Sequence, residues 1–165
     1  MIKRTSIILI LIFSFLVLKT QGQSNDSGLN FSISFDKNVH QSEITGRVYV
    51  MVSRNNNRSP KDQVGISGVP FWGMNVDQLA PGEGALIGDT VFGYPLESIK
   101  EIPAGEYYVQ AFINIYTEFK RSDGHTLWMH KDNWEGQNWK RGEGNLYSEV
   151  KKVYIDPAST ETIEL

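Results

Sequence analysis

The chain has 165 residues, no cysteine and a formal net charge of −3, from 16 Lys and Arg against 19 Asp and Glu. The basic residues are scattered among the acids, so the clustered Lys and Arg of a nucleic-acid surface are missing and nucleic acid is not expected as a partner. Without cysteine there is neither a disulfide nor a lipid-anchored thiol, so the core alone has to stabilise the fold, and 8 Phe, 7 Tyr and 4 Trp can fill it.

The first 22 residues have the pattern of a secretory signal peptide. Lys3 and Arg4 precede an uncharged apolar run over residues 7–18, and the small residues Thr20 and Gly22 stand before an expected cut after Gly22. The apolar run is shorter than the roughly 20 residues that span a bilayer. An uncleaved N-terminal anchor is the alternative. We expect an exported protein, periplasmic or extracellular, that leaves the membrane after signal cleavage.

The remainder of the chain predicts a short flexible segment followed by one domain. Residues 23–28 are small and polar, as flexible N-termini of mature proteins are. Residues 29–165 suit a single domain of ordinary size. The strand pattern still runs at Leu165, which is expected of a fragment or of the first module of a longer protein.

Short runs with a period of two, separated by Gly, Pro and Asn turns, dominate this domain. The clearest half-buried strand is 29–36, and the many Gly and Pro residues between 64 and 96 exclude a long helix there. A polar and aromatic insertion over 120–144 interrupts the strands as one long, Trp-rich loop. The expected strands lie within 29–36, 45–54, 69–72, 85–91, 102–119, 147–156 and 160–165.

The stretch 102–119 predicts the central strand, because large apolar or aromatic side chains occupy both of its faces. Neighbouring strands must therefore cover it on both sides. About seven short strands without βαβ alternation predict an all-β fold, an antiparallel β-sandwich of the immunoglobulin or transthyretin type.

Two histidines and two acids in the insertion form a candidate metal site. Imidazole and carboxylate ligands from Asp123, His125, His130 and Asp132 could together hold a divalent ion such as zinc. The histidines are five residues apart, which matches neither the spacing of a helical pair nor that of a strand pair. The alternative is a turn at Asp123, with both histidines as solvated loop residues.

The same insertion offers an aromatic platform. Trp128, Trp134 and Trp139 could stack on a sugar ring, with hydrogen bonds from Asn133 and Gln137. The alternative is that the tryptophans anchor a long loop by packing over the edge of a sheet.

Catalytic machinery is not recognisable in the chain. Cysteine is absent, and Ser67 lacks the second glycine of a serine elbow because Val69 stands in its place, so Ser67 is expected in a turn. A pair among Asp89, Glu101 and Glu118 remains open for glycoside cleavage. We expect no catalytic residue and no cofactor.

Several short motifs resemble a β-rich region that precedes an esterase of the α/β-hydrolase type in secreted bacterial proteins. They are GRVYV at 46–50, GYP at 93–95, IPAGEYYVQA at 102–111 and GNLYS at 144–148. The resemblance covers roughly residues 45–156 and implies a non-catalytic N-terminal module, with the hydrolase residues further along a longer chain. No catalytic residue can be carried over, because this sequence contains no hydrolase region.

The expected function is therefore a secreted, non-catalytic β-sandwich module that is an accessory or binding region of a hydrolase-type protein. Its expected partners are a carbohydrate or an adjacent hydrolase domain. The alternatives are a carbohydrate-binding module that uses the Trp-rich loop, and a metal-dependent enzyme centred on His125 and His130.

Overall fold

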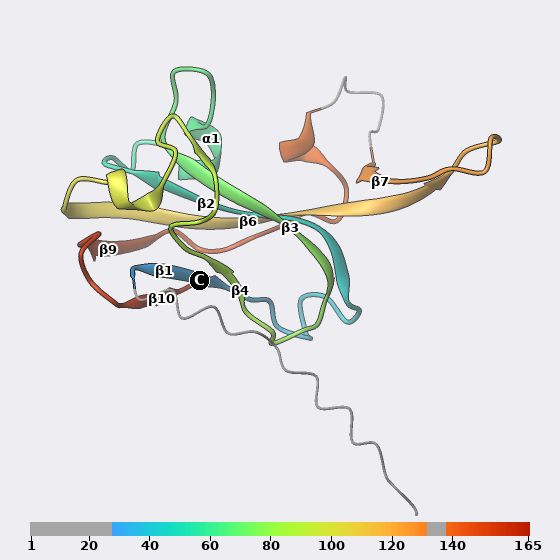
Figure 1. Ribbon diagram of the computed structural model, residues 1–165, viewed down its shortest axis with the longest axis horizontal. Helices are drawn as coiled ribbons and strands as arrows, with labels where there is room; N and C mark the ends of the chain where they lie inside the picture. The colour runs from blue at the N-terminus through green and yellow to red at the C-terminus, as the bar shows by residue number, and fades with distance from the viewer. Residues whose placement is uncertain (1–27, 132–137) are drawn as a thin grey trace, which may run out of the picture.

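The computed structural model describes residues 28–131 and 138–165, and these form an all-β fold (Figure 1). The predicted all-β class is confirmed. The predicted signal peptide, 1–22, lies outside the described residues. Within the described ranges, no helix is long and apolar enough to cross a membrane.

Strands account for most of the regular structure, and the helical segments are single turns. The helical segments are α1 (Pro60–Gln63), η1 (Ile99–Glu101) and η2 (Trp139–Arg141). The strands are β1 (Asn30–Ile33), β2 (Ile44–Ser53), β3 (Phe71–Leu79), β4 (Ala85–Ile87), β5 (Gly93–Tyr94), β6 (Gly105–Lys120), β7 (Thr126–His130), β8 (Leu146–Tyr147), β9 (Lys151–Ile155) and β10 (Thr162–Glu164).

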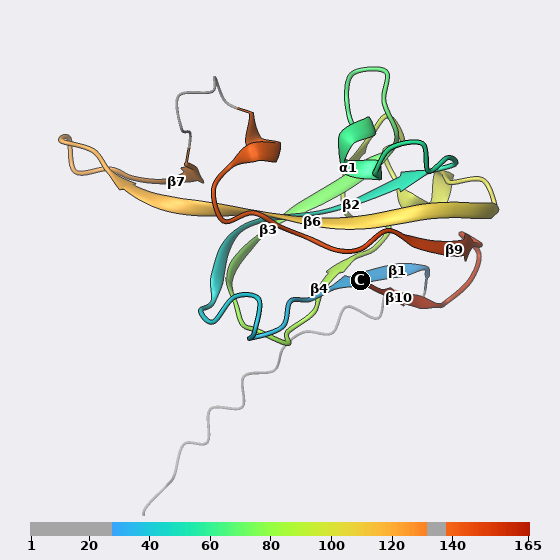
Figure 2. The same ribbon diagram turned by 180° about the vertical axis from the view of Figure 1, so that it is seen from behind.

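These strands form two sheets that lie one above the other (Figures 1 and 2). The smaller sheet has the order β10-β1-β4, and the larger has the order β5-β3-β2-β6-β7, with β8 and β9 also paired to β6. All pairs are antiparallel except β1 with β10, which is parallel. That pair departs from the purely antiparallel sandwich expected from the sequence, because β10 returns to the smaller sheet alongside β1.

Strand β6 is the centre of the larger sheet, as predicted. It pairs with β2 along 108–115, and different parts of it pair with β9, β8 and β7. Val109, Ala111 and Ile113 point into the core between the sheets, and Gln110 and Phe112 are buried on the opposite face. The prediction that both faces of this strand are covered is therefore confirmed.

The core lies between the two sheets. Phe31 and Ile33 of the smaller sheet belong to the same buried cluster as Val48, Val50 and Trp72 of the larger one. The expectation of a half-buried strand at 29–36 is wrong for β1, whose four residues are all buried. Its polar residues are covered as well: Asn30 Nδ2 donates to the Gly28 carbonyl at 2.8 Å, and Gly84 lies against the Ser32 hydroxyl.

The expectation of one long loop over 120–144 is wrong in its first part. Strand β6 continues to Lys120, and β7 pairs with it from Thr126 to His130. A turn with Gly124 at φ 86° joins the two strands. The resulting hairpin extends away from the two-sheet body (Figure 1).

Candidate functional site: an aromatic groove on the outer face

The structure places the described members of the predicted metal site at two ends of one strand. His125 and Asp123 lie at the hairpin turn, with 3.3 Å between His125 Nδ1 and Asp123 Oδ1, whereas His130 ends β7 opposite Tyr116. Five strand residues separate the histidines by roughly 16 Å. No group of three potential ligands is found among the described residues. Asp132 lies outside them, so a site that includes it stays a prediction.

The predicted aromatic platform is divided between two regions. Trp128 is on β7, where its side chain is 49% exposed. Trp139 begins η2 and packs on the larger sheet. No ring contact joins these two described tryptophans, and Asn133, Trp134 and Gln137 lie outside the described residues.

Ser67 and the three candidate carboxylates are not brought together in one place. Ser67 is exposed in a turn, as predicted. Asp89 pairs with Lys100, and Glu101 caps η1 through the backbone N–H of Ser98, whose hydroxyl also donates to the Asp89 carbonyl. Glu118 lies on strand β6 where it pairs with β7, away from the other two acids.

An aromatic cluster covers the face of the larger sheet that points away from the core. Alternation along β2 and β6 brings Tyr49 and Phe112 to this face, and they are directly opposite each other in the register. The Trp139 ring lies 4.9 Å from that of Tyr49, at an interplanar angle of 31°, and 5.3 Å from that of Phe112. Phe71 of β3 and Tyr94 of β5 continue the cluster, with 6.3 Å between Phe71 and Tyr49 and 6.4 Å between Phe71 and Tyr94. These separations are typical of favourable aromatic pairs.

Gly73 is the reason that the Tyr49 ring can lie across β3. Gly73 stands opposite Tyr49 in the β2–β3 register. A Cβ atom at Gly73 would come within 2.5 Å of Tyr49 Cδ1, well inside van der Waals contact. The missing side chain therefore sets the position of the ring at the centre of the cluster.

Two amide side chains attach η2 to β6. Asn114, which is 1% exposed, donates from Nδ2 to the Trp139 carbonyl (3.1 Å) and to Asn145 Oδ1 (2.9 Å). Asn145 donates from its own Nδ2 to the same carbonyl at 2.8 Å, and its Oδ1 also accepts from the Ile115 N–H at 3.2 Å. These four hydrogen bonds hold Trp139 against the sheet.

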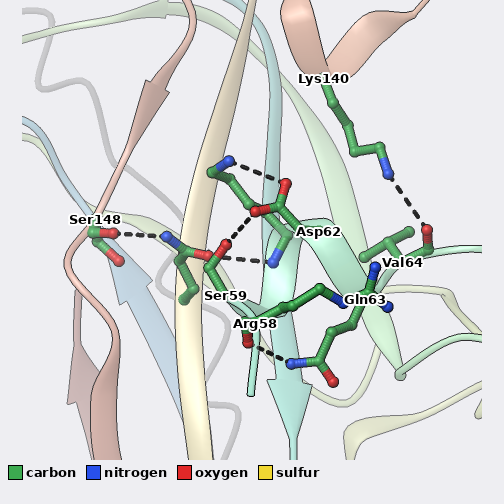
Figure 3. A network of polar contacts seen from close by, with 9 residues as sticks. Arg58, Ser59, Asp62, Gln63, Val64, Lys140 and Ser148 are labelled. Atoms are coloured by element: carbon green, nitrogen blue, oxygen red, sulfur yellow. Dashed lines mark hydrogen bonds and ion pairs between the residues drawn. The ribbon is translucent and has the colours of Figure 1, made fainter. Parts of the chain in front are cut away.

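The segment around α1 forms the facing wall, and polar contacts fix it in place (Figure 3). Gln110 accepts from the backbone N–H of Lys61 at Oε1 (3.1 Å) and donates from Nε2 to the Ser148 carbonyl (2.9 Å). Lys140 Nζ donates to the Val64 carbonyl at 3.3 Å, which joins η2 to this wall across 76 positions of sequence. Both walls are thus tied to each other as well as to the sheet.

The two walls and the sheet enclose a groove of about 400 Å³. This volume lies within the range of roughly 300–1,000 Å³ that is typical of small-molecule sites. We call it the aromatic groove. Its lining residues are Val64, Gly65, Ile66, Phe71, Tyr94, Trp139 and Lys140.

The environment of the groove determines the protonation and hydrogen bonding of the polar groups in and beside it. Burial raises the pKa of Tyr49, against the opposing effect of Arg47, so its hydroxyl stays protonated at neutral pH. The hydroxyl of Tyr94 donates to the Ile66 carbonyl at 2.9 Å. In the adjoining wall, the Ser59 hydroxyl donates to Asp62 Oδ2 and lowers the pKa of that carboxyl, with a smaller contribution from Lys61. The described lining of the groove therefore offers aromatic rings, a tyrosine hydroxyl and a cation.

Sequence reasoning identified Trp139 but missed Ile66, Phe71, Tyr94 and Lys140. Phe71 and Tyr94 are paired in the β3–β5 register, yet they are distant in sequence. The available signal was the alternation in β6, which indicated that both faces of this strand are covered.

Comparison of the chain with protein-family models, with curated proteins and with solved structures gives no match.

Proposed function

We propose that the protein is an exported, non-catalytic binding module whose aromatic groove holds a carbohydrate. The observation that carries this proposal is the groove itself, in which Phe71, Tyr94 and Trp139 converge from three separate elements. Sugar rings present an apolar face to aromatic side chains and hydroxyl groups at their edges. Shallow aromatic sites with a few polar groups suit such ligands.

The polar groups around the rings match the edges of a sugar. The Tyr94 hydroxyl donates to the Ile66 carbonyl and keeps its oxygen lone pairs for a ligand donor. The ammonium of Lys140 has three donors, of which one is used by the Val64 carbonyl. A stacked ring would thus find both donors and acceptors within the groove.

The site is also held in place before any ligand arrives. The hydrogen bonds from Asn114 and Asn145 fix one wall, and those of Gln110 fix the other. A preorganised site loses less conformational entropy on binding. This rigidity favours a binding surface over a loop that merely covers the sheet.

The resemblance noted above adds a role to this binding. An accessory module beside an esterase would keep the enzyme close to a polysaccharide and raise the local concentration of substrate. The carbohydrate-binding role does not depend on that arrangement.

Retention in affinity gels that contain soluble polysaccharides tests the proposal, with the protein purified without its signal peptide. Tyr94→Ala removes an exposed aromatic ring that lines the groove. Trp128→Ala is the matched control, because it removes a similarly exposed aromatic ring on the hairpin. We expect Tyr94→Ala to lose retention while both variants keep the wild-type melting temperature within a few degrees. Wild-type protein that no polysaccharide in a broad panel retards, or equal retention of the two variants, would refute the proposal.

A further inference from the structure

The charged side chains described at the aromatic groove and its walls are positive on balance, opposite to the whole chain. Among the described residues that line the groove, Lys140 carries the charge, and it is partly buried in its wall. Its described contact is with the neutral Val64 carbonyl at 3.3 Å. Its charge also helps to lower the pKa of the Asp62 carboxyl in the adjoining wall, so the ammonium acts both on that carboxylate and on the groove.

Arg47 adds a second cation at the same cluster of rings. Its guanidinium carbon lies 5.5 Å from the centroid of the Tyr49 ring, the ring that stacks on Trp139. It donates to Asn75 Oδ1 at 2.8 Å and to the Gly73 carbonyl at 2.6 Å, both uncharged acceptors. These hydrogen bonds position Arg47 without neutralising it.

The acid in the adjoining wall already has a partner. Asp62 Oδ1 lies 3.1 Å from Lys61 Nζ, so these two side chains cancel each other. Together with Lys140 and Arg47 they carry a net formal charge of +2 (three cations and one carboxylate), in a chain whose formal net charge is −3. A local excess of positive charge on an acidic protein attracts anions to that place.

From this charge complementarity, and resting on the proposed function, we infer that the carbohydrate is acidic. The sugar would stack on the rings of Phe71, Tyr94 and Trp139, with an anionic substituent, a ring carboxylate or a sulfate ester, beside Lys140. An ammonium is a compact point charge and binds either group. Arg47 adds long-range attraction from the other side of Tyr49.

The inference predicts a dependence on charge that a neutral sugar would not show. Lys140→Gln should weaken binding of an acidic polysaccharide about 5- to 20-fold, the range between an exposed ion pair and a charge-assisted hydrogen bond. Binding should also weaken as salt rises from 0.05 to 1 M, because the Debye length falls to about 3 Å. Lys140→Arg keeps the charge and should keep most of the affinity.

The experiment compares matched ligands by titration calorimetry. One arm uses oligogalacturonate and its neutral methyl ester, and a second uses a sulfated galactan oligosaccharide and its desulfated form, so that carboxylate and sulfate are distinguished. The control variant is Lys120→Gln, which makes the same change of charge on the hairpin, where Lys120 lies 3.6 Å from Glu118. We expect one acidic ligand to bind more tightly than its neutral form, and Lys140→Gln but not Lys120→Gln to reduce the difference.

The other outcomes separate the two claims. Equal binding of acidic and neutral forms would overturn the acidic ligand and leave a carbohydrate-binding module standing. An equal loss in Lys140→Gln and Lys120→Gln would show diffuse attraction and overturn the assignment to Lys140. Absence of binding to these oligosaccharides and to the broad neutral panel alike would remove the proposed function itself.

Discussion

Gly73→Ala is the substitution that tests most directly how the aromatic groove is built. The new Cβ atom would lie 2.5 Å from Tyr49 Cδ1, 2.8 Å from Cε1 and 3.1 Å from the Val48 carbonyl oxygen. The Tyr49 ring cannot simply turn away, because Phe71, Phe112 and Trp139 surround it. Either the ring or strand β3 has to move.

The expected cost follows from this overlap. Carbon atoms pack best at about 3.5–4.0 Å, so the ring has to move by about 1 Å. Overpacking of this size typically costs about 1–3 kcal/mol, and replacing glycine inside a strand returns roughly 0.5–1 kcal/mol. Because Tyr49 is enclosed by rings, we take the upper part of the resulting range of about 0–2.5 kcal/mol and expect a net loss of more than about 1 kcal/mol in the free energy of unfolding, together with weaker carbohydrate binding because the support of Trp139 shifts.

Urea denaturation monitored by tryptophan fluorescence measures this loss. Gly65→Ala is the matched control, since a Cβ atom at Gly65 meets nothing within 4 Å, and it should stay within about 0.5 kcal/mol of wild type. In a Tyr49→Ala background the ring that the new methyl group would meet is gone, so Gly73→Ala should lower the free energy of unfolding much less there. If Gly73→Ala unfolds at the wild-type urea concentration, or costs the same in both backgrounds, the assignment of Gly73 to the Tyr49 ring is wrong.

Other substitutions test the remaining parts of the structure. Asn145→Ala should weaken ligand binding, because it removes one of the two side-chain hydrogen bonds to the Trp139 carbonyl and the acceptor that holds Asn114; unchanged affinity by calorimetry would contradict this. Trp128→Ala should change the free energy of unfolding by less than about 0.5 kcal/mol, whereas Trp139→Ala should cost more than about 1 kcal/mol because its ring packs in the cluster; equal urea midpoints would disprove the difference. Trp72→Ala should cost about 3–5 kcal/mol in the free energy of unfolding, because it leaves a large cavity in the core. Trp72→Phe should cost far less, because it also removes Nε1, a buried donor without a hydrogen-bond partner among the described residues. Similar losses in the two variants would count against this. The lowered pKa of Asp62 stabilises the fold above the ordinary carboxyl pKa, and this contribution is lost as the pH falls through the folded-state value. The difference in unfolding free energy between wild type and Asp62→Asn should therefore shrink as the pH falls below the ordinary carboxyl pKa, and a difference that stays constant over that range in urea titrations would refute this contribution.

The sequence was most informative about β6 and least informative about the groove. The period of two around Val109 and Phe112 indicated a strand covered on both faces, and the larger sheet confirms it. The hairpin was missed because Leu127, Trp128 and Met129 are consecutive large apolar residues, which hide the alternation of β7.

The groove escaped prediction for a different reason. Its rings come together only through strand register, in which Phe71 faces Tyr94, and through the packing of η2 on Tyr49. A single sequence shows which faces are apolar, but it does not show which distant strands are neighbours. Tyr94 lies in a strand of two residues, which is too short for any period to be visible.

The connection from Lys140 to Val64 spans 76 positions, so the two walls of the groove meet only after segments far apart in the sequence have come together. A ligand that binds in the groove binds the folded protein and not the unfolded chain, so it stabilises the folded state. At one hundred times its dissociation constant such a ligand protects the chain by about 2.7 kcal/mol. If the proposed carbohydrate is that ligand, its presence would slow proteolysis of this protein without disulfides wherever the cleavage sites open only on unfolding.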